Sequence, residues 1–307
     1  MSNSPVTMTI TYVALGFLAF FIIITNLFVM FLIYNRRSLR TPTNLCLASL
    51  AASDFMAGSI AIPLIIMCNV SPLDGLRQAM DFSSRFISIS TVIHLLIVTI
   101  ERYIMICHGM KYNLWINTKR VVTVLVATWL FSAVATLIQL FWKLTQTEEQ
   151  ILKVDRIYDT VCLCCVVIIP LIIMAASYVR IFIALRYQLQ QIQRYNNPTE
   201  KSNELRRRHV ERKAAIIFGC MIITFTLCWF SYFIDGLNIF TYSFEVSLVL
   251  MFLRYVSPFI NPLLYTFLKE DFKLAVKMSL CQRFREASTN SYLYQSHFAP
   301  SNSESAV

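Results

Sequence analysis

The chain contains few charged residues for its length. Lysine, arginine, aspartate and glutamate together make up 14% of its 307 residues, whereas hydrophobic residues make up 57%. A water-soluble protein of this size needs more polar side chains than this to cover its surface. The scarcity of charge therefore argues against soluble domains and favours a membrane protein.

The chain also lacks the residue patterns of common enzymes and of disulfide-stabilised proteins. It has four histidines, no HExxH sequence and no recognisable Ser/His/Asp set, so an enzyme is not expected. It has nine cysteines, but the polar segment Lys143–Tyr158 contains none of them. A secreted disulfide framework is therefore not expected, and the cysteines are interpreted as small apolar side chains.

Long uncharged runs are what the chain does contain. The first, Tyr12–Tyr34, has no charged residue and is long enough to cross about 30 Å of hydrocarbon as an α-helix. Six further apolar blocks follow, at residues 44–68, 79–106, 121–142, 158–184, 214–240 and 247–268. The expected fold class is therefore an all-α membrane protein, in which a short extracellular segment, 1–11, precedes a bundle of seven transmembrane helices over residues 12–268.

The lysines and arginines of the loops predict the orientation of this bundle. They concentrate after the first, third and fifth blocks, at Arg36, Arg37, Arg40, Lys111, Lys119, Arg120, Arg186, Arg194, Lys201, Arg206, Arg207, Arg208, Arg212 and Lys213. By the positive-inside rule the N-terminus is extracellular and the C-terminus cytoplasmic, in a multi-pass protein of the plasma membrane. The net charge of +10 then faces anionic membrane lipid. Because this charge is divided among loops, it does not indicate nucleic-acid binding.

The segment after the seventh block predicts a helix of another kind. Between its lysines, residues 269–284 carry apolar side chains at Phe272, Leu274, Ala275, Met278 and Leu280. This spacing predicts a short amphipathic helix on the membrane surface, with Cys281 as a candidate for palmitoylation. The serine-rich tail, 285–307, is expected to be disordered and to bind arrestin when phosphorylated. Its end, with Ser305 and Val307, resembles a ligand of PDZ domains.

A charged pair interrupts the third apolar block. The sequence LLIVTIERYIMICHG places Glu101 and Arg102 beside Tyr103, although a pair at the end of a helix is commonly only a solvated cap. The other blocks carry distinctive residues too: Asn26, Asp54, Trp129, Pro170 with Tyr178, FTLCWF at 225–230, and NPLLY at 261–265. Together these marks resemble those of the rhodopsin-like (class A) G-protein-coupled receptors, over about residues 12–284, with some likeness to adenosine, aminergic and melanocortin-type receptors.

The resemblance implies a receptor that binds a small extracellular ligand among its helices and activates heterotrimeric G proteins by opening its cytoplasmic face. Arg102 would pair with Glu101 or with Glu211, and a pair with Glu211 would hold the third helix against the sixth until ligand binding breaks it. Tyr178 and Tyr265 would then turn toward Arg102. The switch residues implied are Glu101, Arg102, Tyr103, Met110, Tyr178, Glu211, Asn261, Pro262 and Tyr265, and Met110 would contact the G protein.

Asp54 places a carboxylate near the middle of the membrane, where it requires polar partners. In the family such a carboxylate holds a sodium ion that favours the inactive state. The resemblance implies the same site here, built from Asp54, Thr91, Ser257 and Asn261. The alternative is a protonated, hydrogen-bonded Asp54 without an ion, and no other cofactor is expected.

Four apolar residues, Val92, Pro170, Phe225 and Trp229, resemble the core through which the family converts ligand contact into helix movement. One departure is Ser231, which stands where the family usually has a proline. Proline removes a backbone hydrogen bond and kinks a helix, whereas serine bends it only slightly. A weaker or displaced hinge is therefore expected.

The ligand itself is not identified by the sequence. The candidate pocket residues are Asp81, Ser84, Arg85, Ser88, Asp235, Arg254 and Tyr255. Ser84 stands where aminergic receptors place an aspartate. Arg85 and Arg254 either pair with nearby aspartates or bind a carboxylate or phosphate of the ligand, and both possibilities are open at this point.

Two other classes of protein are alternatives to a signalling receptor. A transporter or channel would predict inverted repeats, with helices broken by glycine or proline in both halves, and the sequence shows neither. A seven-helix receptor that does not signal is the second alternative, because Ser231 replaces the usual proline.

Overall fold

The computed structural model describes residues 5–71, 73–145, 147–192, 198–235 and 243–278. Throughout this part of the chain the secondary structure is helical, without β-strands. Seven of the helical segments are long and apolar enough to cross a membrane. The predicted all-α fold with seven spans is therefore confirmed.

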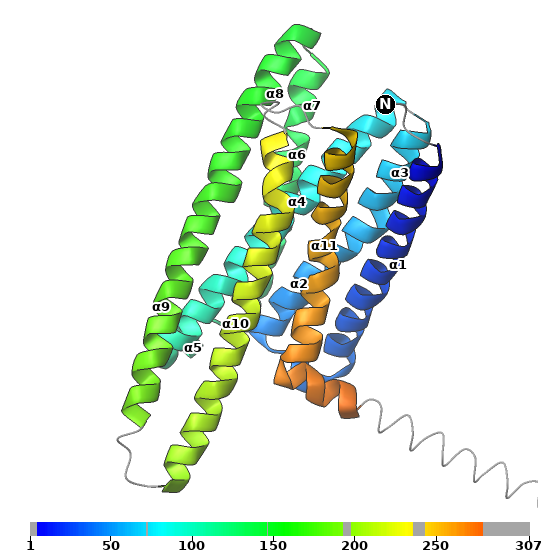
Figure 1. Ribbon diagram of the computed structural model, residues 1–307. Coiled ribbons are helices and arrows are strands. Elements are labelled where there is room, and N and C mark those ends of the chain that lie inside the picture. The colour runs from blue at the N-terminus through cyan, green and yellow to red at the C-terminus, as the bar shows by residue number, and fades with distance from the viewer. Residues whose placement is uncertain (1–4, 72, 146, 193–197, 236–242, 279–307) are drawn as a thin grey trace, which may run out of the picture.

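The helices run side by side as an elongated bundle (Figure 1). Their bounds are α1 Pro5–Asn35, η1 Arg37–Leu39, α2 Pro42–Met56, η2 Ala57–Ala61, α3 Ile62–Val70, α4 Asp74–Cys107, α5 Gly109–Trp115, α6 Thr118–Leu137, α7 Gln139–Lys143, α8 Glu148–Cys162, η3 Leu163–Ile168, α9 Ile169–Ile192, α10 Pro198–Asp235 and α11 Phe244–Leu268. Here η2 and η3 are π-helical turns within the second and fifth spans.

Polar residues at the helix starts explain several of these boundaries. The side chain of Thr41 accepts a hydrogen bond from the Asn44 amide and precedes Pro42, so α2 begins there. Asn117 caps α6 in the same way, through the Arg120 amide at 2.8 Å. These caps satisfy amides that have no partner within the helix.

The outside of the bundle is apolar, as expected for contact with lipid. Phe17, Phe20 and Phe131 expose 63%, 55% and 52% of their surface, all within spanning helices. In water such exposure would be strongly unfavourable, whereas lipid chains accept it without cost. The interior contains the polar side chains instead, including the fully buried amide of Asn26, which donates to the carbonyl of Pro258 at 3.0 Å and ties α1 to α11.

Two element boundaries differ from the sequence-based expectation. The first helix already begins at Pro5 rather than at Tyr12, because the intervening residues carry no charge that would end it. The fifth span was expected to begin at 158, yet α8 begins at Glu148 and continues through η3 into α9. At its start, Thr147 and Gln150 bond reciprocally as a capping box, which converts most of the expected loop into helix.

A short helical segment, 270–278, follows α11 and confirms the expected amphipathic helix. Phe272 and Ala275 are buried, and the Phe272 ring packs against Tyr265 with ring centroids 5.7 Å apart. Leu274 and Met278 are exposed and are available to lipid. The remainder of the expected segment 269–284, including Leu280 and Cys281, and the tail 285–307 lie outside the described residues.

Candidate functional site

The Arg102 guanidinium lies near the end of α4, where the bundle meets α5 and α10. Its side chain is nearly buried, and its Nε lies 3.4 Å from Oε2 of the adjacent Glu101. A buried guanidinium requires an anionic partner. The structure supplies that partner from the same helix.

Two further residues hold the Glu101 carboxylate in position. Its Oε1 accepts hydrogen bonds from Thr43 of α2 at 2.7 Å and from Tyr112 of α5 at 2.6 Å. Burial and the Glu101 charge raise the pKa of Tyr112, so its hydroxyl remains a donor. Sequence reasoning missed both residues, because a single Thr or Tyr more than ten positions away along the chain gives no pattern that points to Glu101.

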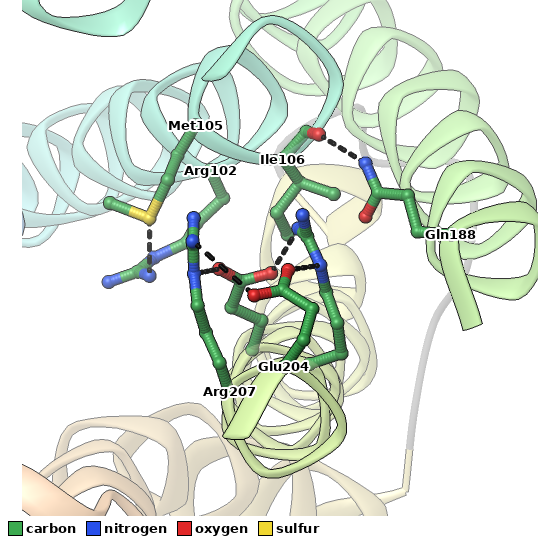
Figure 2. Close-up of polar contacts among 8 residues, drawn as sticks. Arg102, Met105, Ile106, Gln188, Glu204 and Arg207 are labelled. Carbon is green, nitrogen blue, oxygen red and sulfur yellow. Dashed lines mark hydrogen bonds and ion pairs between the residues drawn. The ribbon is translucent and has the colours of Figure 1, made fainter. Parts of the chain in front are cut away.

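The contact from Arg102 to α10 is made with an aromatic ring. The guanidinium carbon lies 4.9 Å from the centroid of the Phe218 ring, and both side chains are buried. Its Nη1 also lies 3.4 Å from the sulfur of Met105, one turn further along α4 (Figure 2). The third and sixth spans are therefore linked through a cation–π contact.

The alternative ion pair, between Arg102 and Glu211, is not formed among the described residues. Glu211 instead bonds to Arg208 at 2.8 Å and to Arg207 at 3.3 Å, both on α10 itself (part of this network is drawn in Figure 2). These arginines lie three and four residues before Glu211, on the same helix face, where such pairs form with little ordering. Of the two partners that the sequence offered for Arg102, the structure therefore forms the pair with Glu101, and local arginines satisfy the Glu211 carboxylate.

A second link joins α10 to the segment 270–278. The ammonium of Lys213 lies 2.6 Å from Glu270, and both side chains are about half exposed. This bond lowers the pKa of Glu270. The start of the sixth span is thereby held beside the end of the seventh.

Lys269 is the buried counterpart of this exposed pair. Its ammonium donates to Asn44 of α2 and lies 3.4 Å from Asp271. Burial, together with the nearby Arg102 charge, lowers the pKa of Lys269 from 10.5 to about 8. Near neutral pH this site therefore carries a second positive charge close to Arg102.

These residues line one cavity of about 340 Å³ at the Arg102 end of the bundle. Its walls come from α2, α4, α5, α10 and the start of the segment 270–278, and they include Thr43, Arg102, Tyr112, Glu211 and Lys269. Movement of α10 would widen this cavity. Arg102 and Glu211, both predicted from the sequence, thus line the same cavity but do not form an ion pair with each other.

Two tyrosines predicted as switch residues lie in the buried interior. Tyr178 of α9 and Tyr265 of α11 are buried, and neither hydroxyl has a hydrogen-bond partner among the described residues. A buried hydroxyl without a partner is unfavourable.

The remaining predicted switch residues lie along α4, α5 and α11. The ring of Tyr103 packs edge-on against His108, with centroids 5.5 Å apart. Pro262 stands inside α11 with Pro258. Met110, on α5, is 99% exposed, which leaves this apolar side chain free to meet a partner.

Asp54 and Asn261 meet in the middle of the bundle. The Asn261 amide donates to Asp54 Oδ2 at 3.0 Å. Three fully buried oxygens beside this bond have no hydrogen-bond partner among the described residues: Asp54 Oδ1, Ser257 Oγ and Asn261 Oδ1. Thr91 is bonded to Ser53 at 3.3 Å. Oxygen donors of this kind suit a hard cation, and no larger His, Cys, Asp and Glu cluster occurs in the described ranges.

Two residues of the predicted transmission core are in contact. The rings of Phe225 and Trp229 are stacked at 6.1 Å, and Trp229 meets Tyr255 of α11 at 6.5 Å. Val92 and Pro170 are buried as well. Ser231, the departure in α10, lies two residues beyond Trp229, where side chains are outside the described part of the structure.

Arg85 lies at the opposite end of the bundle and has an acidic partner there. Arg85 forms an ion pair with Asp159 of α8 and stacks over the Tyr158 ring, 5.4 Å from its centroid. Asp159 was not among the partners suggested by the sequence, Asp81 and Asp235, and the side chain of Asp235 lies outside the described residues. Asp159 was missed because the fifth span was expected to begin only one residue earlier, at 158.

The other predicted pocket residues lie nearby on α4 and α11. Ser84, Ser88 and Tyr255 are buried, and the Ser88 hydroxyl donates to the Arg85 carbonyl at 2.9 Å. Asp81 is partly buried. Arg254 is half-buried on α11, and the side chain of Asp235 is outside the described residues.

Comparison with known proteins agrees with this geometry. Residues 25–265 match the family model described as 7 transmembrane receptor (rhodopsin family). The chain is 27% identical to trace amine-associated receptor 7d of Mus musculus, over 95% of this chain and 88% of that receptor. It is 28% identical to trace amine-associated receptor 7b of Rattus norvegicus over the same shares. It is also 27% identical to trace amine-associated receptor 9 of Mus musculus, over 95% and 91%.

Proposed function

Since this chain belongs to the seven-transmembrane receptors of the rhodopsin family, we propose that it signals by releasing α10 from Arg102 when a ligand binds at the opposite end of the bundle. Membership of the family makes it a multi-pass plasma-membrane receptor rather than an enzyme, a transporter or a channel. The family's partners are a heterotrimeric G protein and a small-molecule ligand. The residues that perform the switch in this chain are the subject of the proposal.

The observation that carries the proposal is the buried contact between Arg102 and Phe218 beside the cavity. In the present state this contact and the Lys213–Glu270 bond keep α10 close to the rest of the bundle. Outward movement of α10 breaks both contacts and exposes Arg102 to a docking partner. Tyr178 and Tyr265 then supply hydroxyls that have no other partner among the described residues.

The orientation we propose places the Arg102 end in the cytoplasm. The basic loop residues support it, and so does the fully exposed Met110 on α5, which suits contact with a G protein. The N-terminus is then extracellular and the ligand enters near Arg85. The proposed arrestin and PDZ-domain contacts of the tail, through its serines and through Ser305 and Val307, and the palmitoylation of Cys281 rest on the sequence alone.

We further propose that sodium binds beside Asp54 and stabilises the closed state. The three buried oxygens without partners support this role, with Asp54 supplying the negative charge. Thr91 adjoins the site through Ser53. A protonated Asp54 would donate one hydrogen bond and so would satisfy at most one of the Ser257 and Asn261 oxygens.

The proposed ligand site is the cluster around Arg85 at the extracellular end. The Arg85–Asp159 ion pair supports an internal role for Arg85, so we assign direct ligand contacts to Asp81, Ser84 and Tyr255. The names of the relatives refer to trace amines, and Asp81 is the carboxylate here that would pair with a ligand ammonium.

The test of the proposed function is basal and ligand-stimulated second-messenger output in cells. Cyclic AMP and calcium are measured for the wild type and for Arg102→Ala at equal surface expression, with a panel of amines and carboxylic acids as ligands. We expect signalling from the wild type and none from Arg102→Ala. Equal output from the two proteins would refute the proposed switch, and loss of amine responses in Asp81→Asn would identify the ligand anchor.

A further inference from the structure

A second cavity lies on the outside of the bundle, at the cytoplasmic level of the proposed orientation. It measures about 520 Å³, within the range of about 300–1,000 Å³ typical of small-molecule pockets. Its wall is formed by α2, α4, α5 and the first two turns of α6. It is separate from the cavity that contains Arg102 and Lys269, although Glu101 lies at the boundary between them.

The part of this groove between α4 and α6 is apolar and open to lipid. Ile97, Ile100, Val121 and Val124 line it, and Ile100 and Val124 expose 41% and 46% of their surface. These side chains belong to membrane-spanning helices. Exposed apolar side chains at this depth contact acyl chains and not water.

The rim of the groove at the start of α6 carries two positive charges. Lys119 and Arg120, in the first turn of α6, line it and are exposed. Arg120 donates to the carbonyls of Leu114 and Trp115 at 2.7 and 3.2 Å, so its guanidinium is held above the groove. Trp115 lines the same rim at 45% exposure, as an amphipathic ring does at a membrane interface.

We infer that this groove binds one anionic phospholipid of the inner leaflet. An acyl chain lies along the isoleucines and valines, and the phosphate meets Lys119 and Arg120. Basic pockets between spanning helices on the cytoplasmic side are suited to such headgroups. The acyl chain of a zwitterionic lipid fits the apolar part equally well. The positive charge of the rim is therefore what favours an anionic lipid over a zwitterionic one.

The position of the groove gives this lipid a connection to the switch. Glu101 lines the groove and also holds Arg102, while α5 contributes both Trp115 to the groove and Tyr112 to Glu101. A bound lipid therefore fixes α5 against α4. The inference uses the orientation proposed above and does not depend on coupling to a G protein.

Trp115 allows the inference to be tested directly. The purified full-length receptor is placed in nanodiscs of phosphatidylcholine containing increasing amounts of either dibrominated phosphatidylserine or dibrominated phosphatidylcholine, which quench nearby tryptophans. The fluorescence of Trp115 is obtained as the difference between the wild type and Trp115→Phe. We expect brominated phosphatidylserine to reach half-maximal quenching at a lower mole fraction than brominated phosphatidylcholine. The expected difference is about fivefold for each rim charge that contacts the phosphatidylserine headgroup.

Two variants locate the headgroup. Lys119→Gln is expected to reduce the preference for phosphatidylserine about fivefold, because one charge is lost. Lys277→Gln, which removes an exposed charge on the segment 270–278, away from the groove, is expected to leave the preference unchanged. Identical quenching curves for the two brominated lipids in the Trp115 difference signal would overturn the inference. An equal loss of preference in both variants would overturn the assigned site.

Discussion

Replacing Phe218 with leucine is the sharpest test of how the closed state is held. Leucine keeps an apolar side chain at this buried position but removes the ring face that lies 4.9 Å from the Arg102 guanidinium. A cation–π contact between desolvated groups contributes about 2 kcal/mol. If this contact exists only in the closed state, its loss shifts the equilibrium toward the open state by about 30-fold.

The assay is basal cyclic AMP and calcium output, normalised to the amount of receptor at the cell surface. We expect Phe218→Leu to raise basal output well above the wild type, and Arg102→Ala to remain silent. Glu211→Gln is the discriminating control, because Glu211 bonds to Arg207 and Arg208 of its own helix. Unchanged output from Phe218→Leu, combined with raised output from Glu211→Gln, would refute the reasoning and restore the ion-pair lock.

Three further predictions concern the polar groups near the switch. Asp54→Asn should abolish the increase in thermal stability that sodium, but not a bulky organic cation, gives to the purified wild type; a sodium response that survives the substitution would contradict the cation site. Tyr112→Phe should lower the free energy of unfolding by about 1.5–3 kcal/mol, measured by thermal unfolding, because Glu101 loses a hydrogen bond to a buried charge. Lys269→Gln should change the pH dependence of stability. The pKa of Lys269 is lowered from 10.5 to about 8 in the folded protein, so between these pH values the unfolded chain binds one more proton than the folded chain. The stability of the wild type relative to the variant should therefore rise with pH from 8 to 10.5. The total rise should be on the order of 3 kcal/mol at most. A difference that is flat with pH would show that Lys269 titrates normally.

The sequence predicted the fold well because the spans are encoded locally. A run such as Tyr12–Tyr34 without charge has few alternatives to a membrane helix. Side chains placed by their own helix were also predictable, such as the stacked pair Phe225 and Trp229. The relative positions of such side chains can be deduced from the sequence of a single helix.

Contacts between helices were less predictable, because several side chains compete for each partner. Glu211 was one of two candidate partners for Arg102, but arginines on its own helix were closer. The contact from α10 to Arg102 is made by Phe218. Similarly, Arg85 paired with Asp159 of α8, although the sequence had suggested other aspartates. The rotation of each helix about its axis and its depth in the membrane determine these pairs, and neither can be deduced from the sequence of one helix.

The continuous fifth span has a mechanical consequence. The spanning segment Glu149–Ile192 contains 44 residues, which at 1.5 Å per residue makes a rod of about 66 Å, roughly twice the hydrocarbon thickness. One end of the rod carries Asp159, bound to Arg85, and the other carries Gln188, whose amide donates to the Ile106 carbonyl on α4 at 3.1 Å (Figure 2). A tilt of about 3° about Asp159 displaces Gln188, about 44 Å further along the rod, by about 2 Å, enough to break that hydrogen bond. A ligand that shifts Asp159 therefore acts on a long lever arm, whose stiffness is interrupted at the π-helical turn η3 and at Pro170.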